Sequence, residues 1–466
     1  MRRLSIALPI ALALAAGCAG MAEEDDGSGP GGKADDPSES GAALPDPNAS
    51  EPPPVDWLPP PVDEWPDAYV VFNNTGCARA CGKEDQDALK SRSVMVKMIV
   101  AAIHSVKEGG TIRVANFNIS SSSGVTPVVD ALVFAMRERG ATVEIAMDSA
   151  QDVAESRTNQ LAGEGADVRF SRGLRFESSF DGSEQFGILH SKMVIVDDQV
   201  LFTGSNNFSS SGFVTNEENS VVLRAPAHGD RVRAFICDFD AMFASGSRPG
   251  EEPKPDDDPA RKAAIASLDG CMTDDAWFPP ASLLTSGKSV TFGVLFGAIA
   301  GAVESVDISP DMLAHPGLVA ALLDRAREAV ADGAPFRARV VLDASPEALG
   351  NPAFGQCLED AAAAEKLPIE VRYWQGNEEI FQLLHHKMMV IDAEGDDPMV
   401  FNGSANYSTK ALKFSFENVA RYRGDAFAEL DHHFAARFER IFEEAETAAD
   451  LSARGTVVPN CPIPDL

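Results

Sequence analysis

Two short stretches of the chain carry the same reactive side chains at the same spacing. Each has a histidine, a lysine two positions later and an aspartate seven positions later: His190, Lys192 and Asp197 in the first stretch, and His385, Lys387 and Asp392 in the second. The two histidines stand 195 positions apart. A histidine can attack a phosphorus atom or exchange a proton, and a lysine can hold a phosphate oxygen. The pattern therefore indicates metal-free chemistry at a phosphate group.

A Gly-Ser-x-Asn segment follows each stretch. These segments contribute Ser205 and Asn207 after the first stretch and Ser404 and Asn406 after the second. Hydroxyl and carboxamide groups can bind phosphate oxygens, and the glycine of each segment permits close backbone approach to a ligand. We expect these four side chains to line a phosphate site together with the two lysines.

The residues after each histidine have the composition of buried strands. The runs 193–196 and 388–391 are entirely apolar. Residues two apart on a strand share a face, so His190 and Lys192 are predicted to point the same way. The aspartate of each motif lies an odd number of positions on and is predicted to be structural. His386 falls on the opposite face from the histidine before it, so we do not expect it to be catalytic.

Cleavage of a phosphodiester without a metal needs a nucleophile, a proton donor and positive charge on the phosphate oxygens. Two histidines on opposite sides of one phosphate could attack and donate a proton in line. A nucleophilic imidazole also needs a hydrogen bond at its other nitrogen. Glu218 and Glu417 follow the two motifs at similar places and are the candidates for that bond. No cofactor or metal ion is expected.

The duplicated HxKxxxxD motif with a trailing GSxN resembles the phospholipase D superfamily. The resemblance implies that one histidine forms a phosphohistidine and that the other protonates the leaving group. By the same resemblance His190 would be the nucleophile and His385 the acid, with the motif lysines and asparagines on the phosphate. The acidic residue of an N-x-E-N segment would hold a histidine. The second half has Ser415 where that segment has its first Asn, so the resemblance supports Glu218 more strongly than Glu417.

The two halves repeat one order of elements. The patterns predict helices over 84–108, 126–140, 291–303 and 316–333, and strands over 112–119, 143–147, near 306 and over 338–342. Asp148 and Asp343, which follow corresponding strands, are again 195 positions apart. Helices that alternate with strands predict an α/β fold with a largely parallel sheet. We expect two similar domains related by a pseudo-two-fold axis, with one active site between them.

Composition divides the chain into five parts. These are a signal peptide over 1–18, an acidic Pro- and Gly-rich disordered tether over 19–66, a first domain over 67–245, a linker over 246–262 and a second domain over 263–466. The small residues before Cys18 are similar to a lipobox, so Cys18 is the predicted lipidation site. The expected location is outside the cytoplasm, as a cell-envelope lipoprotein or a secreted protein. The six other cysteines predict up to three disulfides, whose pairing the sequence leaves open.

The net charge of the chain limits the classes of substrate that are expected. Lys and Arg number 39 against 71 Asp and Glu, a formal net charge of −32, which disfavours tracking along a nucleic acid backbone. The leading hypothesis is hydrolysis of phosphatidyl head groups to phosphatidic acid at a membrane surface, with transphosphatidylation as a variant. A secreted endonuclease acting on DNA or RNA and a non-catalytic phosphate-binding protein stay open. A monomer is expected. The segments 208–213 and 374–381, each with an aromatic residue at both ends, flank the motifs and could contact lipid or belong to the core.

Overall fold

The computed structural model describes residues 43–49, 53–73, 85–151, 157–177, 182–280, 289–345, 354–456, 458–459 and 461. The predicted signal peptide, the predicted lipidation site Cys18, most of the predicted tether, and both Cys77 and Cys81 lie outside these residues. Most of each predicted domain lies within them.

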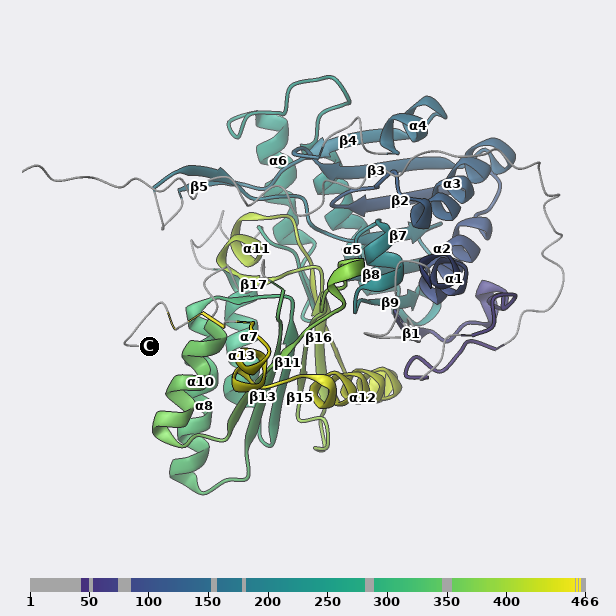
Figure 1. Cartoon of the computed structure of the whole chain (residues 1–466). Helices are drawn as coiled ribbons and strands as arrows, with labels where there is room; N and C mark the ends of the chain where they lie inside the picture. Colours follow the sequence, from purple (N-terminus) through teal and green to yellow (C-terminus); the bar gives the residue numbers. More distant parts are fainter. Residues whose placement is uncertain are drawn as a thin grey trace, which may run out of the picture. The chain divides into compact units, whose positions relative to one another are not determined.

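Two seven-stranded sheets with the same strand order form the framework (Figure 1). The first sheet runs β1 (Ala68–Phe72), β9 (Asn219–Arg224), β8 (Val200–Gly204), β7 (Met193–Val196), β2 (Thr111–Asn116), β3 (Thr142–Asp148) and β4 (Asp167–Ser171). The second runs β10 (Ala276–Trp277), β18 (Val419–Arg423), β16 (Met399–Gly403), β15 (Lys387–Ile391), β11 (Ser305–Pro310), β13 (Arg337–Asp343) and β14 (Ile369–Trp374). The matching orders confirm the predicted duplication.

Each sheet is mixed rather than largely parallel. Strands β2, β3 and β4 run parallel, whereas β7, β8, β9 and β1 pair antiparallel, and the second sheet repeats this division. The parallel part that the sequence predicted is therefore joined by an antiparallel part that carries the motifs. The antiparallel part arises from a local feature of the chain. Strands β7 and β8 form a hairpin that turns through Asp197 and Asp198, both with positive φ, and the two strands of a hairpin are antiparallel.

Helices cover the sheets. They are α1 (Gln86–Arg92), α2 (Val94–His104), α3 (Thr126–Arg139), α4 (Thr158–Gly163), α5 (Ala225–Ser245), α6 (Pro259–Ser267), α7 (Val290–Gly301), α8 (Pro316–Asp332), α10 (Phe354–Glu365), α11 (Thr409–Phe414), α12 (Ala428–Glu444) and α13 (Ala448–Ala453). Gly140 and Gly333 end α3 and α8 in the left-handed conformation, as the sequence predicted. In the part of the chain that is described, no helix combines the length and apolarity needed to cross a bilayer.

A single apolar core joins the two halves. One cluster of buried side chains includes Leu189 and Phe239 from the first half together with Leu384, Phe416 and Phe434 from the second. Of two further clusters, one lies in the first half except for Ile380, and the other lies in the second half. Helix α12 of the second half also contacts β1 of the first sheet. Because burial of apolar surface holds the halves together, side chains from both can be fixed in one site.

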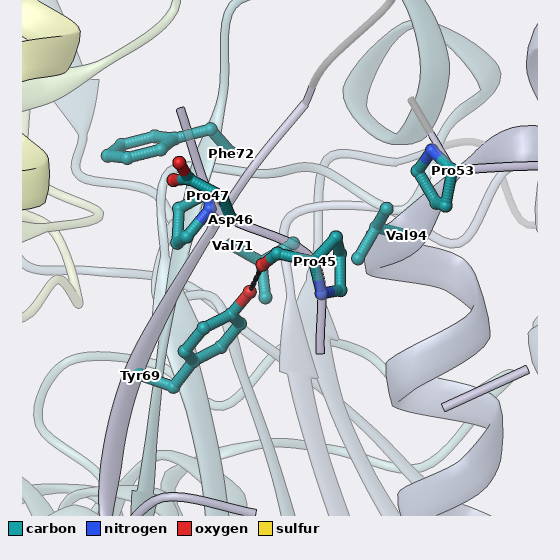
Figure 2. Close-up of a pocket in the computed structure, with 8 residues that line it drawn as sticks. All are labelled: Pro45, Asp46, Pro47, Pro53, Tyr69, Val71, Phe72 and Val94. Carbon is teal, nitrogen blue, oxygen red and sulfur yellow. Dashed lines mark hydrogen bonds between the residues drawn. The ribbon is translucent and has the colours of Figure 1, made fainter. Parts of the chain in front are cut away.

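The predicted disordered tether is ordered at its C-terminal end. Trp57 and Trp65 are buried in the core of the first half, and Lys97 donates from Nζ to the carbonyls of Val55 and Trp57. Figure 2 shows Pro45 beside Tyr69, whose hydroxyl donates to the Pro45 carbonyl. The prediction of a disordered tether up to residue 66 is therefore wrong over 43–49 and 53–66, because the tryptophans offer enough apolar surface to dock the segment.

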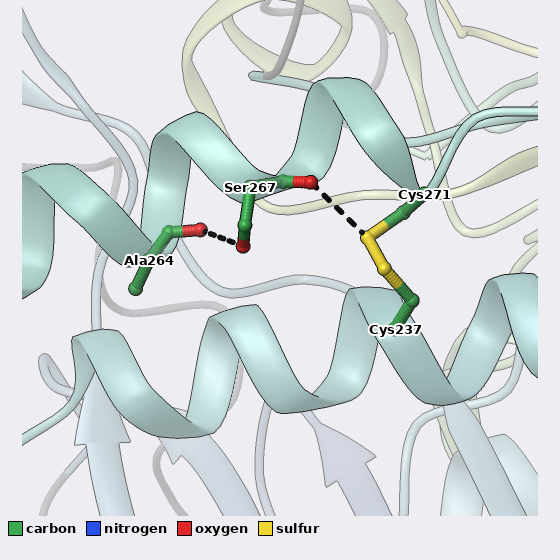
Figure 3. Close-up of a disulfide and its surroundings, with 4 residues drawn as sticks. All are labelled: Cys237, Ala264, Ser267 and Cys271. Carbon is green, nitrogen blue, oxygen red and sulfur yellow. Dashed lines mark hydrogen bonds between the residues drawn. A yellow bond between two sulfur atoms is a disulfide. The ribbon is translucent and has the colours of Figure 1, made fainter.

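Two disulfides fasten the segments that follow each half. Cys237 on α5 pairs with Cys271, just beyond α6 (Figure 3), and Cys357 on α10 pairs with Cys461 near the C-terminus. The predicted linker over 246–262 is structured at both ends. Ser247 pairs with Phe170 of β4, and α6 begins at Pro259. Disulfides of this kind are typical of proteins exposed to an oxidising, extracytoplasmic environment.

Candidate active site

Each motif histidine lies just before its strand and is held by the backbone of the other half. The amide of His190 donates to the Phe416 carbonyl (2.8 Å), and the amide of His385 donates to the Glu217 carbonyl (3.0 Å). These reciprocal bonds belong to short bridges between Leu189 and Phe416 and between Glu217 and Leu384. The contact is thus self-complementary, as expected for a pseudo-two-fold interface.

The carboxylates cross from one half to the other. Glu417 of the second half lies with Oε1 2.9 Å from Nδ1 of His190, a buried hydrogen bond. Glu218 of the first half lies with Oε1 2.7 Å from Nδ1 of His385. The second contact is as short, but its direction is not that of a hydrogen bond, so Nδ1 of His385 has a close carboxylate without a formed hydrogen bond. Each histidine therefore depends on the opposite half for its orientation.

The serines of the Gly-Ser-x-Asn segments hold these carboxylates. Ser205 donates from Oγ to Glu218 (2.5 Å), and Ser404 donates to Glu417 (2.6 Å). Each serine oxygen also accepts a backbone amide, from Asn219 and Asn418. Since a hydroxyl has one proton to donate, the predicted binding of phosphate by these serines is wrong in this arrangement.

The glycines of the same segments also differ from the prediction. A Cβ on Gly204 would lie 2.1 Å from the Asn219 carbonyl oxygen, and one on Gly403 would lie 2.2 Å from that of Asn418. The close approach that requires glycine is therefore to the neighbouring strand rather than to a ligand.

Ser415 replaces the missing asparagine of the second half. In the first half, Asn216 accepts the Leu383 amide through Oδ1 (3.1 Å). In the second half, Ser415 accepts the Ile188 amide through Oγ (3.1 Å). The two contacts occupy corresponding places across the interface, so the departure from N-x-E-N leaves Glu417 as well placed as Glu218.

Burial shifts the protonation of these pairs. It raises the pKa of Glu417 to about 8 and that of Glu218 to about 7. Burial also lowers the pKa of His385 to about 3 and that of His190 well below its usual value. The charges of Lys192, Lys387 and His385 lower the pKa of His190 further, which places both motifs at one site.

The motif lysines are buried beside the histidines. Lys192 donates from Nζ to the His190 carbonyl (2.7 Å), and Lys387 donates to the His385 carbonyl (2.8 Å). Burial lowers the pKa of Lys192 to about 7. One of the three donors of each ammonium is used in this bond, so the others stay free to bind an anion.

Each predicted asparagine has an unpaired amide oxygen. Among the described residues, Oδ1 of Asn207 and Oδ1 of Asn406 are buried without a hydrogen-bond partner. Buried acceptors without partners are uncommon in folded proteins, and these two could accept a hydrogen bond from a ligand. No group of three or more His, Cys, Asp or Glu side chains within the described residues could hold a metal ion.

The motif aspartates bind backbone away from the histidines. Asp197 accepts the amides of Lys107 and Thr111, at the start of β2. Asp392 accepts the amides of Val303, Glu304 and Ser305, at the start of β11. Both carboxylates therefore bind backbone amides at or just before the start of the strand that pairs with the motif strand, a structural arrangement.

The sequence did not predict the role of Asp148 and Asp343, which is to position the motif histidines. Asp148 accepts the Leu189 amide (2.7 Å) and Asp343 accepts the Leu384 amide (2.6 Å), in each case 41 residues further along. Each carboxylate thus fixes the residue directly before a motif histidine. Their equal spacing from the histidines was the signal in the sequence that could have found them.

The other candidates from the sequence lie in the core. His386 is fully buried, with Nδ1 2.9 Å from Nδ2 of Asn219. Phe208, Phe213 and Trp374 are also buried, whereas Phe381 is 65 % exposed. Only the end of the segment 374–381 can therefore contact a surface.

A family model described as cardiolipin synthase, PLD-like domain, matches residues 99–243 and 295–444, which include both motifs. The chain belongs to this phospholipase D-like family. Membership of this family, the duplicated motifs and the fold together indicate that the chain is a phosphodiesterase-type enzyme. No curated protein matches the chain.

One of the solved structures that match the chain supports the fold. Phosphatidylserine synthase of Haemophilus influenzae Rd KW20 is 12 % identical, with 76 % of this chain and 85 % of that chain covered and a TM-score of 0.54. The phospholipase D family member Nuc of Salmonella typhimurium is 23 % identical, with 40 % of this chain and 98 % of Nuc covered and a TM-score of 0.27. The first of these supports the two-halved fold.

Proposed function

We propose that the chain is a phospholipase D-type phosphodiesterase that hydrolyses phosphatidyl head groups to phosphatidic acid. His190 attacks the phosphorus through Nε2, and the bond to the head-group oxygen breaks. His385 donates a proton to the departing alkoxide. His385 then removes a proton from a water molecule, which attacks the phosphohistidine and releases phosphatidic acid. An alcohol in place of water gives transphosphatidylation.

The observation that carries the proposal is the crossed pairing of each histidine with a buried glutamate. A carboxylate that accepts the Nδ1 proton leaves the Nε2 lone pair free for attack and makes it more basic. Glu417 lies at hydrogen-bond distance from His190 and is held there by Ser404. The lysines and the amides of Asn207 and Asn406 supply donors for the non-bridging oxygens.

The surrounding charges support His190 as the nucleophile. Burial and then the cations Lys192, Lys387 and Lys410 all lower the pKa of His190, which favours the neutral ring that attack requires. The pKa of His385 is lowered by burial and by the charges of Lys387 and Lys192, but the carboxylate of Asp311 opposes this shift, which favours a proton donor at His385 rather than at His190.

A phospholipid substrate agrees with the charge of the protein. The net charge of −32 opposes a nucleic acid, which is bound largely through neutralised phosphates. A single phosphodiester in a lipid needs only the local cations of the site. An exposed aromatic side chain, Phe381, stands shortly before the second motif and suits contact with a lipid surface.

Product analysis tests the proposal. The full-length chain is offered phosphatidylcholine in mixed micelles and, separately, single-stranded DNA, with His190→Ala and His385→Ala as controls. Release of phosphatidic acid that both substitutions abolish is the expected result. Shortened DNA with intact lipid would assign the chain to the nucleases instead. Absence of turnover on both substrates would favour a phosphate-binding protein without catalysis.

A further inference from the structure

The two halves of the site differ at one pair of equivalent positions. The registers of β2 on β7 and of β11 on β15 make Phe117 the counterpart of Asp311. The Phe117 ring meets the His190 ring edge-on, with 5.6 Å between ring centroids. Asp311 instead lies with Oδ2 3.9 Å from Nε2 of His385 and 3.7 Å from Nζ of Lys387. The apolar ring of Phe117 beside His190 therefore corresponds to the carboxylate of Asp311 beside His385.

The Asp311 carboxylate is fixed in place but incompletely paired. Its backbone amide donates to the His386 carbonyl (2.8 Å), which anchors the residue next to the motif. Nε2 of His385 and Nζ of Lys387 both lie beyond hydrogen-bond distance, and within the described residues the carboxylate accepts no hydrogen bond. Its side chain is 16 % exposed, so it borders the site without being sealed off.

A carboxylate at this place opposes the binding of an anion. A phosphate is attracted to the lysines and repelled by a negative charge a few ångströms away. The arrangement becomes favourable when the substrate brings a positive charge of its own. In an in-line displacement the leaving oxygen departs on the side of the acid, opposite the nucleophile. With His385 as the acid, the alcohol that leaves therefore passes beside Asp311.

We propose that Asp311 is a specificity-determining residue that selects leaving alcohols carrying an ammonium group, such as the choline and ethanolamine head groups of phospholipids. The ammonium of such an alcohol is two carbons from the leaving oxygen, within reach of a carboxylate 3.9 Å from the same Nε2. A neutral glycerol head group gains nothing from Asp311. The inference rests on the proposed function and adds the class of head group.

The test compares two lipids whose head groups both leave as alkoxides and therefore both need a proton from the acid. Initial rates of phosphatidic acid formation from phosphatidylcholine and from phosphatidylglycerol, in the same neutral-detergent micelles, give a ratio of kcat/KM values. The full-length chain is compared with Asp311→Asn, which is nearly isosteric. Asp332→Asn is the matched control, because it removes the same charge from the exposed end of α8.

We expect the choline-to-glycerol ratio to fall roughly tenfold in Asp311→Asn, the size of a partly screened charge pair, and to be unchanged in Asp332→Asn. Turnover of phosphatidylglycerol by Asp311→Asn also shows that the variant is folded. Equal losses on both lipids would overturn the specificity role and leave the phospholipase function standing, since Asp311 would then act only on His385. Failure of the unsubstituted chain to form phosphatidic acid from either lipid would overturn the proposed function and this inference together.

Discussion

At the scale of single residues, burial decides what the catalytic groups can do. Glu417 and Glu218 are among the most buried side chains, and burial raises their pKa values to about 8 and about 7. Each faces a histidine whose pKa burial lowers. Near neutral pH, each pair therefore has one proton, on its glutamate, that can be gained or lost. Catalysis requires that the pair of the nucleophile has lost this proton and that the pair of the acid has kept it.

The activity is therefore predicted to depend on pH as a bell. The rate rises with pH as Glu417 ionises and can accept the Nδ1 proton of His190, through a pKa of about 8. It falls as the pair of Glu218 and His385 loses its proton, through a pKa of about 7. We expect kcat/KM to be greatest between pH 7 and pH 8. A profile that stays flat from about pH 5 to about pH 9 would mean that neither pair controls the chemistry.

At the scale of elements, helix α12 ties the second half to the loop that holds His385. Arg437 on α12 is fully buried, donates to the Asn73 carbonyl (2.6 Å) and forms an ion pair with Glu217. Burial would raise the pKa of Glu217, but Arg437 and the neighbouring His386 and Arg440 hold it at about 2. The ion pair thus fixes the residue whose carbonyl accepts the His385 amide.

Loss of Arg437 is predicted to destabilise the protein strongly. Arg437→Met keeps much of the apolar volume but leaves Glu217 buried with a weaker partner, which costs about 3 kcal/mol of unfolding free energy. Arg440→Met is the matched control: Arg440 is 31 % exposed, and its loss should cost under about 1 kcal/mol. Urea unfolding followed by circular dichroism measures both. Equal losses would show that Arg437 has no special place in the interface.

The sequence predicted the strands that carry the motifs and several of the helices, and it named the two histidines and two lysines that the structure brings together. The motifs, their strands and the helices ending at Gly140 and Gly333 all follow from local patterns. The crossing of Glu218 and Glu417 between halves does not, because it depends on how the two sheets meet. For the same reason the sequence could not show that Ser205 serves a carboxylate.

At the scale of the whole molecule, the duplicated halves make a single site. Their shared core and the reciprocal backbone bonds hold residues from distant parts of the chain together. The described tryptophans before β1 belong to the core of the first half, so removal of residues 1–66 would take Trp57 and Trp65 out of that core. Exposed apolar side chains are few among the described residues, and Phe381 is one of them.

Contact with a lipid surface is predicted to depend on Phe381. Phe381→Ser should lower the rate on phosphatidylcholine vesicles roughly tenfold, because insertion of a phenyl ring into an apolar phase contributes about 1.5–3 kcal/mol. Hydrolysis of a short-chain lipid below its micelle concentration should not change. Val330→Ser, at an exposed apolar position on α8, is the control. Equal losses on vesicles and on the monomeric lipid would place Phe381 in the chemistry rather than at the surface.

The central claim is that one composite site forms a covalent intermediate on His190 while His385 protonates the leaving group. It is tested most directly by mixing the enzyme with a short-chain phosphatidylcholine, stopping the reaction at alkaline pH, at which phosphohistidine survives, and mapping the modified peptide by mass spectrometry. The account predicts a phosphatidyl adduct on His190, absent in His190→Ala. An adduct on His385 instead, or no adduct in an enzyme that turns over, would contradict it.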